Sequence, residues 1–436
     1  MSGGEALDIG DAGGLIISSG GLVAGITVSS GGYIEGTFGQ GEIVSGAIVL
    51  SGGKIISGAL FLEGDIVVSS GGLQMSDVVV GGAVDQVWAG ATVQKGFLSA
   101  GSELELAGRT IVAGVTVSAE VLTTQHSPPG FEDYQSGAIV DTLDESVKSG
   151  GTLAVGSGAV ASATSVYTGG HLLAVSGATV AGATVFGGGT ISGAATVTGE
   201  LVVSSGGTVS GAVVAGGAVD VLWPGAVEAV SVGSGGSLEL AKVVVSGGVT
   251  SVAGPTTTPE TVSGVSLASG AVLDFISGNV NKSGALDVAS GGLASAMAVS
   301  SGGTLAVAAD GSASGTTVRA SGSLTDAGLA VGGSDSGALT VSSGGLASGG
   351  VVAGGGTETI LAGGSVSGVQ VSAGGTMSVA SGGVAAQITL DAGASLVLDG
   401  TLVRSTIGSS TLSGAITGSG TIVEEGLGAA GAGPRA

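Results

Sequence analysis

Few residues in this chain are suited to chemistry, and they are widely spaced. Histidine occurs only at His126 and His171, and cysteine is absent from all 436 residues. Thiolate chemistry and disulfides are therefore excluded, and a catalytic triad or a zinc cluster would have too few members. No glycine-rich stretch continues into the Gly-Lys-Ser/Thr sequence of a phosphate-binding loop. The sequence accordingly predicts a protein that is not an enzyme and that carries no metal or other cofactor.

Carboxylates gather in one place, at Glu132, Asp133, Asp141, Asp144 and Glu145. Their spacing matches neither an EF-hand loop nor the nonapeptide of calcium-binding β-rolls. We interpret this group as a solvated acidic loop, with a specific calcium site as the alternative. Over the whole chain, 32 acidic and 9 basic residues give a net charge of −23. Such a charge opposes direct binding to nucleic acid or to anionic lipid.

Aromatic side chains are the candidate ligand contacts. Trp88 and Trp223 could each stack on a sugar ring, and Phe131 and Tyr134 are further possible ligand contacts. The alternative interpretation is that each tryptophan covers an apolar patch or a corner of the fold. Polysaccharide-cleaving enzymes also use β-helices, but they need acidic and basic residues clustered in a groove. The nine basic residues are scattered along the chain, and no such cluster is visible in the sequence.

A repeat of 19 residues organises the chain. Gly-Gly pairs begin at Gly344, Gly363 and Gly382, and others begin at Gly355 and Gly374 between them. Glycine tolerates the positive φ of tight corners, and the serines that precede many pairs can cap such turns. Internal repeats of this length are typical of solenoids. A longer repeat is also present, since Trp88 and Trp223 lie 135 residues apart in similar passages.

Between the corners, apolar residues alternate with a period of two, which is the period of a β-strand. The pairs that carry this pattern most clearly are Val369 and Val371, Met377 and Val379, Ile388 and Leu390, and Leu396 and Leu398. Strands this short can bury their apolar faces only by stacking turn on turn, and parallel crossovers are right-handed. The sequence predicts an all-β, right-handed parallel β-solenoid (β-helix) of roughly 20 coils with two loop interruptions.

The two interruptions are richer in proline than the repeats are. Proline has no backbone N–H, so it cannot donate a hydrogen bond to a neighbouring strand. The first, 119–148, contains Pro128 and Pro129 and is expected to protrude, either as a tolerated insertion or as a ligand-contacting loop. The predicted organisation is solenoid over 1–118, loop over 119–148, solenoid over 149–253, short loop over 254–261, solenoid over 262–425 and flexible tail over 426–436.

The units VSSGGTVSGAVVAGGAV and VSSGGLASGGVVAGGGT resemble the passenger repeats of AIDA-type autotransporter adhesins. The resemblance covers nearly the whole chain outside the two interruptions. It implies a β-helical passenger domain, secreted or displayed at the outer membrane, that acts in adhesion, self-association or biofilm formation. It also implies O-glycosylation of repeat residues by a glycosyltransferase, and the matching positions are Ser204, Ser205, Thr208, Ser342 and Ser343.

We therefore expect a bacterial cell-surface or secreted adhesive repeat protein. Its expected partners are like molecules, or glycans and proteins of a host or matrix. A passive stalk that presents another domain is the first alternative, and a polysaccharide-active β-helix enzyme is the second. No apolar run is long enough for a transmembrane helix. The signal peptide and the membrane-embedded C-terminal domain of the family are not recognised, so the resemblance leaves the export route open.

Overall fold

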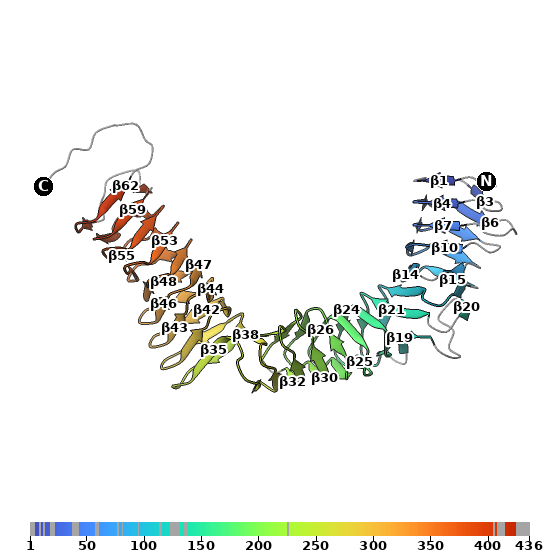
Figure 1. Cartoon of the computed structure of the whole chain (residues 1–436), viewed down its shortest axis with the longest axis horizontal. Coiled ribbons are helices and arrows are strands. Elements are labelled where there is room, and N and C mark those ends of the chain that lie inside the picture. The colour runs from blue at the N-terminus through green and yellow to red at the C-terminus, as the bar shows by residue number, and fades with distance from the viewer. Residues whose placement is uncertain are drawn as a thin grey trace. The chain divides into compact units, whose positions relative to one another are not determined.

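The computed structural model describes residues 5–7, 10–11, 14–17, 22–36, 43–56, 61–75, 78–80, 82–94, 96–112, 116–122, 131–134, 138–224, 226–403, 406–407 and 415–423. Every regular element within them is a β-strand, and the strands stack as a parallel β-solenoid of about 18 turns (Figure 1). The expected all-β solenoid is thus confirmed, with slightly fewer turns than expected. The chain divides into a first unit, Met1–Asp220, Gly225–Val232 and Thr261–Ser266, and a second, Val221–Pro224, Gly233–Glu260 and Leu267–Ala436.

Each early turn of the first unit contains three short strands that belong to three separate sheets. The strands of two consecutive turns are β4 (Leu22–Ala24), β5 (Thr27–Val28) and β6 (Tyr33–Gly36), then β7 (Ile43–Ser45), β8 (Ile48–Val49) and β9 (Lys54–Ile56). Each strand pairs in parallel with its counterpart in the next turn. The short apolar segments therefore cover one another along the stack.

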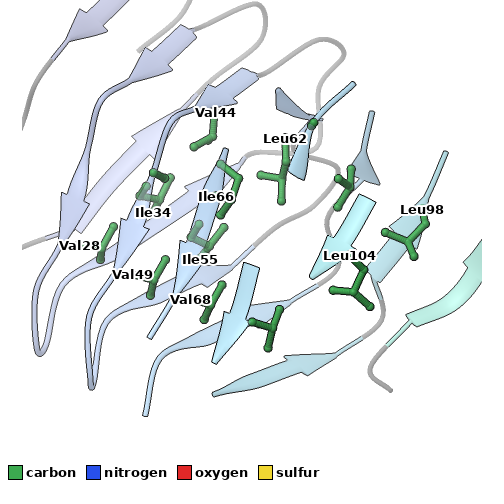
Figure 2. Close-up of a cluster of buried hydrophobic side chains, with 14 of the residues drawn as sticks. Val28, Ile34, Val44, Val49, Ile55, Leu62, Ile66, Val68, Leu98 and Leu104 are labelled. Carbon is green, nitrogen blue, oxygen red and sulfur yellow. The ribbon is translucent and has the colours of Figure 1, made fainter. Parts of the chain in front are cut away.

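The core of the first unit consists of columns of aliphatic side chains. Val28, Val49 and Val68 form one column, and Ile34 and Ile55 belong to another (Figure 2). All five side chains are fully buried. Burying an aliphatic side chain of this size contributes roughly 1.5–3 kcal/mol, so the repeated columns are the main source of stability.

The second unit repeats the three-strand turn with a register of 19 residues. Two consecutive turns are β50 (Leu346–Ser348), β51 (Val351–Val352) and β52 (Thr357–Ile360), then β53 (Ser365–Ser367), β54 (Gln370–Val371) and β55 (Thr376–Val379). Ala347 pairs with Val366, and Ile360 pairs with Val379. The eight alternating apolar residues singled out from the sequence are all buried, which confirms the strand pattern.

The Gly-Gly corners of the second unit lie in register from turn to turn. The backbone N–H of Gly344 donates to the carbonyl of Gly363 (3.0 Å), and that of Gly363 donates to Gly382 (2.9 Å). These glycines have φ values between 80° and 87°. A Cβ at Gly363 would lie 2.6 Å from the Ser343 hydroxyl of the preceding turn. The column predicted from the spacing is therefore confirmed, and both backbone conformation and close packing require glycine there.

The segment 119–148, expected as one protruding loop, returns to the turns before its end. β21 (Ile139–Leu143) pairs in parallel with β17 (Glu103–Ala107), and β22 (Ser146–Val147) pairs with β18 (Thr110–Ile111). Pro128 and Pro129 lie outside the described residues. The apolar residues of β21 and β22 resume the inward columns, which explains why this part stays with the stack.

The segment 254–261, expected as a short loop, instead folds onto the following turn. Gly254 and Pro255 end β35 (Thr250–Pro255) and run antiparallel to β38 (Val272–Phe275). The Thr256 hydroxyl donates to the carbonyl of Ala268 (2.6 Å), and its backbone N–H donates to the carbonyl of Ala271 (2.8 Å). Proline is tolerated here because it occupies the last position of its strand, where no ladder bond from its nitrogen is needed.

Candidate functional site

The first unit contains an open groove beside Trp88. Trp88 ends β14 (Val84–Trp88), in which Asp85 and Val87 point inward while Gln86 and the indole point outward. The groove has a volume of about 490 Å³. Its lining residues are Ser69, Ser70, Trp88, Ala89, Gly108 and Asp144.

The indole of Trp88 is held by a chain of side-chain hydrogen bonds. Its Nε1–H donates to Gln86 Oε1 at 2.9 Å, and Gln86 Nε2 donates to Glu105 Oε2 at 2.6 Å. Gln86 and Glu105 are register partners in adjacent turns, so the strand pairing itself positions this chain. Such bonds fix the ring's orientation and leave the remaining groove surface for a ligand.

Glycine supports the ring from the next turn. A Cβ at Gly108 would lie 3.1 Å from Cε3 of Trp88, and Gly108 has a φ of +66°. The half-buried indole therefore rests against bare backbone. An aromatic face beside the hydroxyls of Ser69 and Ser70 and the exposed carboxylate of Asp144 combines an apolar platform with hydrogen-bonding groups. This combination suits a sugar, which has an apolar C–H face and a polar rim.

Trp223, expected to be equivalent, has a different environment. It follows β31 (Val219–Leu222), and the Nζ of Lys242 lies 4.9 Å from the centroid of its ring. A cation over the ring face is favourable, and it occupies the surface on which a sugar would stack. Trp88 and Trp223 belong to different units, and only Trp88 lines the groove.

The other predicted ligand contacts and the acidic residues do not form one described site. Phe131 and Tyr134 belong to β20 (Phe131–Tyr134), and their side chains lie outside the described set, like those of Glu132 and Asp133. His126 also lies outside it. His171 begins β25 (His171–Ala174) and is exposed.

Asp141 and Glu145 are buried rather than solvated, which differs from the acidic loop expected from the sequence. Asp141 Oδ1 accepts a hydrogen bond from the Val160 N–H at 2.7 Å, and burial raises the pKa of Asp141 to about 7. Burial also raises the pKa of Glu145 to about 7, and the nearby Arg109 guanidinium opposes that rise. Asp144 alone of these three is exposed, and it faces the Trp88 groove.

The residues proposed for O-glycosylation lie at corners and strand starts. Ser205 and Ser343 are exposed, whereas Ser204, Thr208 and Ser342 are half-buried. Ser342 Oγ donates to the carbonyl of Asp326 at 2.9 Å. Ser205 and Ser343 are therefore the more accessible of the five, and their modification remains a prediction.

The second unit carries a repeated polar surface that the sequence analysis did not single out. Outward side chains of β46 (Ser323–Asp326), β49 (Ala338–Val341), β52, β55 and β58 (Ser395–Leu398) stack in two columns across the turns. We call the hydroxyl residues of these columns the hydroxyl face: Ser323, Thr325, Thr340, Thr357, Thr359, Thr376, Ser378 and Ser395. Ala338 and Val397 occupy the two remaining outward positions. The outward position of these hydroxyl residues could have been predicted from the alternation, because each of them is adjacent in sequence to an inward apolar or buried residue.

The chain is similar to a solved structure of another protein. It is the crystal structure of a TibC-catalyzed hyper-glycosylated TibA fragment, 22% identical to this chain with a TM-score of 0.28. The alignment covers 95% of this chain and all of that one. A likeness of this size carries no argument about function. No family model and no curated protein matches the chain.

Two further findings concern the described part of the chain. It contains no group of three or more His, Cys, Asp or Glu residues arranged to hold a metal ion. It also contains no helical segment with the length and hydropathy needed to cross a membrane.

Proposed function

We propose that this chain is a non-catalytic adhesive repeat protein, displayed on a bacterial surface or secreted, that associates with other copies of itself. The observation that carries the proposal is the hydroxyl face, which presents the same chemistry in turn after turn. A contact that is weak in one turn becomes strong when many turns engage together, because later contacts form at high effective concentration. Hydroxyl groups can both donate and accept, so two such faces are self-complementary.

Net charge sets how this association depends on salt. Two copies that each carry a charge of −23 repel one another. Screening shortens the range of this repulsion to about 10 Å at 0.1 M salt. We therefore expect self-association of the purified chain to increase as salt rises from 10 to about 300 mM, measured by light scattering and sedimentation. Dispersal of assemblies by added salt would contradict association through this neutral face.

Charged substitutions on the hydroxyl face test the proposal directly. Thr357 and Thr376 are register partners in adjacent turns, so Thr357→Glu with Thr376→Glu places like charges at the centre of the face. We expect this double variant to lose self-association and the clumping of cells that display the chain. The matched control is Ser295→Glu with Ser314→Glu, a register pair on another face of the same unit. A wild-type chain that stays monomeric and does not clump cells would instead support a passive stalk.

Glycan binding at the Trp88 groove is a second candidate function, favoured by the braced indole beside Asp144. We expect Trp88→Ala to weaken binding to glycans identified on an array by about tenfold or more, the equivalent of about 1.4 kcal/mol of lost stacking. Trp223→Ala is the control, because Lys242 covers that ring, and it should leave glycan binding unchanged. Equal losses in both variants would exclude the groove as the site. Turnover of any polysaccharide above background would contradict the non-catalytic proposal.

A further inference from the structure

Two carboxylates in the second unit occupy positions that other turns fill with apolar side chains. Glu358 lies between Leu339 and Met377 in one inward column. Asp335 lies between Val318 and Val352 in another. Glu358 is 1% exposed and Asp335 is 6% exposed. Both acids therefore point into the core, from adjacent turns.

A third inward column leaves space beside these carboxylates. Its large members are Met297 and Val369, which are both buried. The register of the intervening strands puts Thr316, Gly333 and Gly350 between them. The missing side chains leave a cavity of about 20 Å³ that is lined by Thr316, Asp335, Ser348 and Glu358 together with glycines and apolar residues. We call it the core cavity, and it has room for one water molecule or one ion of similar size.

Several oxygens around the core cavity have no hydrogen-bond partner in the protein. They are Oε1 and Oε2 of Glu358 and Oγ1 of Thr316, whose residue is 4% exposed. Orphaned buried oxygens are costly, and a pair of buried carboxylates without a counter-charge is costlier still. Burial, and then the charge of Asp335, raise the pKa of Glu358 to about 8. Burial likewise raises the pKa of Asp335 to about 7. A backbone hydrogen bond from Val318 lowers the pKa of Asp335 in part.

We propose that the core cavity binds one calcium ion, held by the carboxylates of Asp335 and Glu358 and the hydroxyl of Thr316. The two carboxylates offer up to four oxygens and Thr316 offers a fifth. Calcium usually takes about six to eight oxygen ligands in flexible geometry, so at least one more would have to come from a backbone carbonyl of the residues that line the cavity, whereas magnesium requires an octahedron and keeps several waters. A cavity with room for one small particle cannot hold such a hydrated magnesium ion. The ion would also neutralise the negative charge of both carboxylates, which bulk solvent does not reach.

The proposed ligands come from three consecutive turns. Thr316 belongs to the turn of β44 (Ser312–Ser314), Asp335 to that of β47 (Leu329–Val331), and Glu358 to that of β50. Calcium would therefore hold three turns together, as a cross-link inside the solenoid. Because both acids are almost fully buried, the ion would exchange slowly, through local opening of the turns.

The test uses the full chain, first treated with EGTA and then exchanged into buffer with calcium, magnesium or neither. We expect about one bound calcium per chain by elemental analysis, and a melting temperature several degrees higher with calcium than with EGTA. Magnesium at the same concentration should give a clearly smaller shift. Glu358→Gln should lose both the bound calcium and the shift. The control is Asp85→Asn, which alters a buried carboxylate in the first unit and should keep both.

A second variant keeps the test informative if Glu358→Gln does not fold. Thr316→Val removes one ligand without changing the charge, and we expect it to lower calcium affinity by about tenfold or more. Identical melting of the wild-type chain in calcium and EGTA would overturn the proposal. Retention of the calcium shift in both Glu358→Gln and Thr316→Val would overturn it as well.

Discussion

Replacing Gly193 with alanine is expected to destabilise the first unit by about 3 kcal/mol or more, the largest loss that a single methyl group should cause here. Gly193 ends β27 (Thr190–Gly193), has a φ of +110°, and pairs with Ala174 of the preceding turn. A Cβ there would meet the Ala174 carbonyl oxygen well inside van der Waals contact. The variant therefore adds a collision with backbone, which cannot rotate away, to the strain of a left-handed conformation.

Gly217 provides the matched control in the same unit. It has a φ of +84°, but a Cβ there would have no atom within 4 Å. Gly217→Ala should therefore cost only the conformational strain, about 1–2 kcal/mol. Urea unfolding of both variants measures the difference, which isolates the close approach of adjacent turns. Equal losses in the two variants would mean that the turns are less tightly stacked at Gly193 than described.

The repeat could be predicted from the sequence because its two signals are local and strong. Gly344, Gly363 and Gly382 recur at a constant interval, and hydrogen bonds join them in one column. Met377 and Val379 alternate with polar residues, and both are buried. Periodicity of this kind fixes both the register and the inward face, so the fold followed directly.

The buried carboxylates could not be predicted by a rule that treats charged residues as outward. Glu358 has the same parity as Ile360 in β52, and parity rather than polarity determines the direction of a strand side chain. The difference between the two tryptophans was equally hidden. Their spacing indicated equivalence, but Lys242 covers one ring, and that contact depends on how the following turn is arranged. Contacts between side chains of neighbouring turns depend on the register and on the length of each side chain. The period of the repeat alone does not give this information.

A second large effect is expected at Asp85, in the core of the first unit. Gln74 Nε2 donates to Asp85 Oδ2 at 2.9 Å, and both residues are almost fully buried. The remaining oxygens, Gln74 Oε1 and Asp85 Oδ1, have no hydrogen-bond partner in the protein. When Asp85 is ionised, Gln74 Oε1 and Asp85 Oδ1 are both acceptors and cannot form a hydrogen bond with each other. A proton on Asp85 Oδ1 would supply the missing donor. Burial raises the pKa of Asp85 to about 7, and the Gln74 hydrogen bond lowers it in part.

This shift has a definite sign in the dependence of stability on pH. The folded pKa lies above the unfolded value of 3.8, so the folded state binds the proton more tightly. The favourable contribution is complete below about pH 4 and is lost as pH rises to about 7 and beyond. A difference of about three pKa units corresponds to about 4 kcal/mol as an upper bound. Ionised Asp85 should thus destabilise the first unit in mildly alkaline buffer.

Asp85→Asn should remove this pH dependence, because an amide can donate to Gln74 Oε1 and accept from Gln74 Nε2 at every pH. We expect the variant to be about as stable as wild type at pH 4 and about 2–4 kcal/mol more stable at pH 8, measured by urea unfolding. The control is Asp65→Asn, an exposed aspartate beside Ile66, the register partner of Asp85. A variant no more stable than wild type at pH 8 would mean that Asp85 keeps its charge in the core and finds another partner for it.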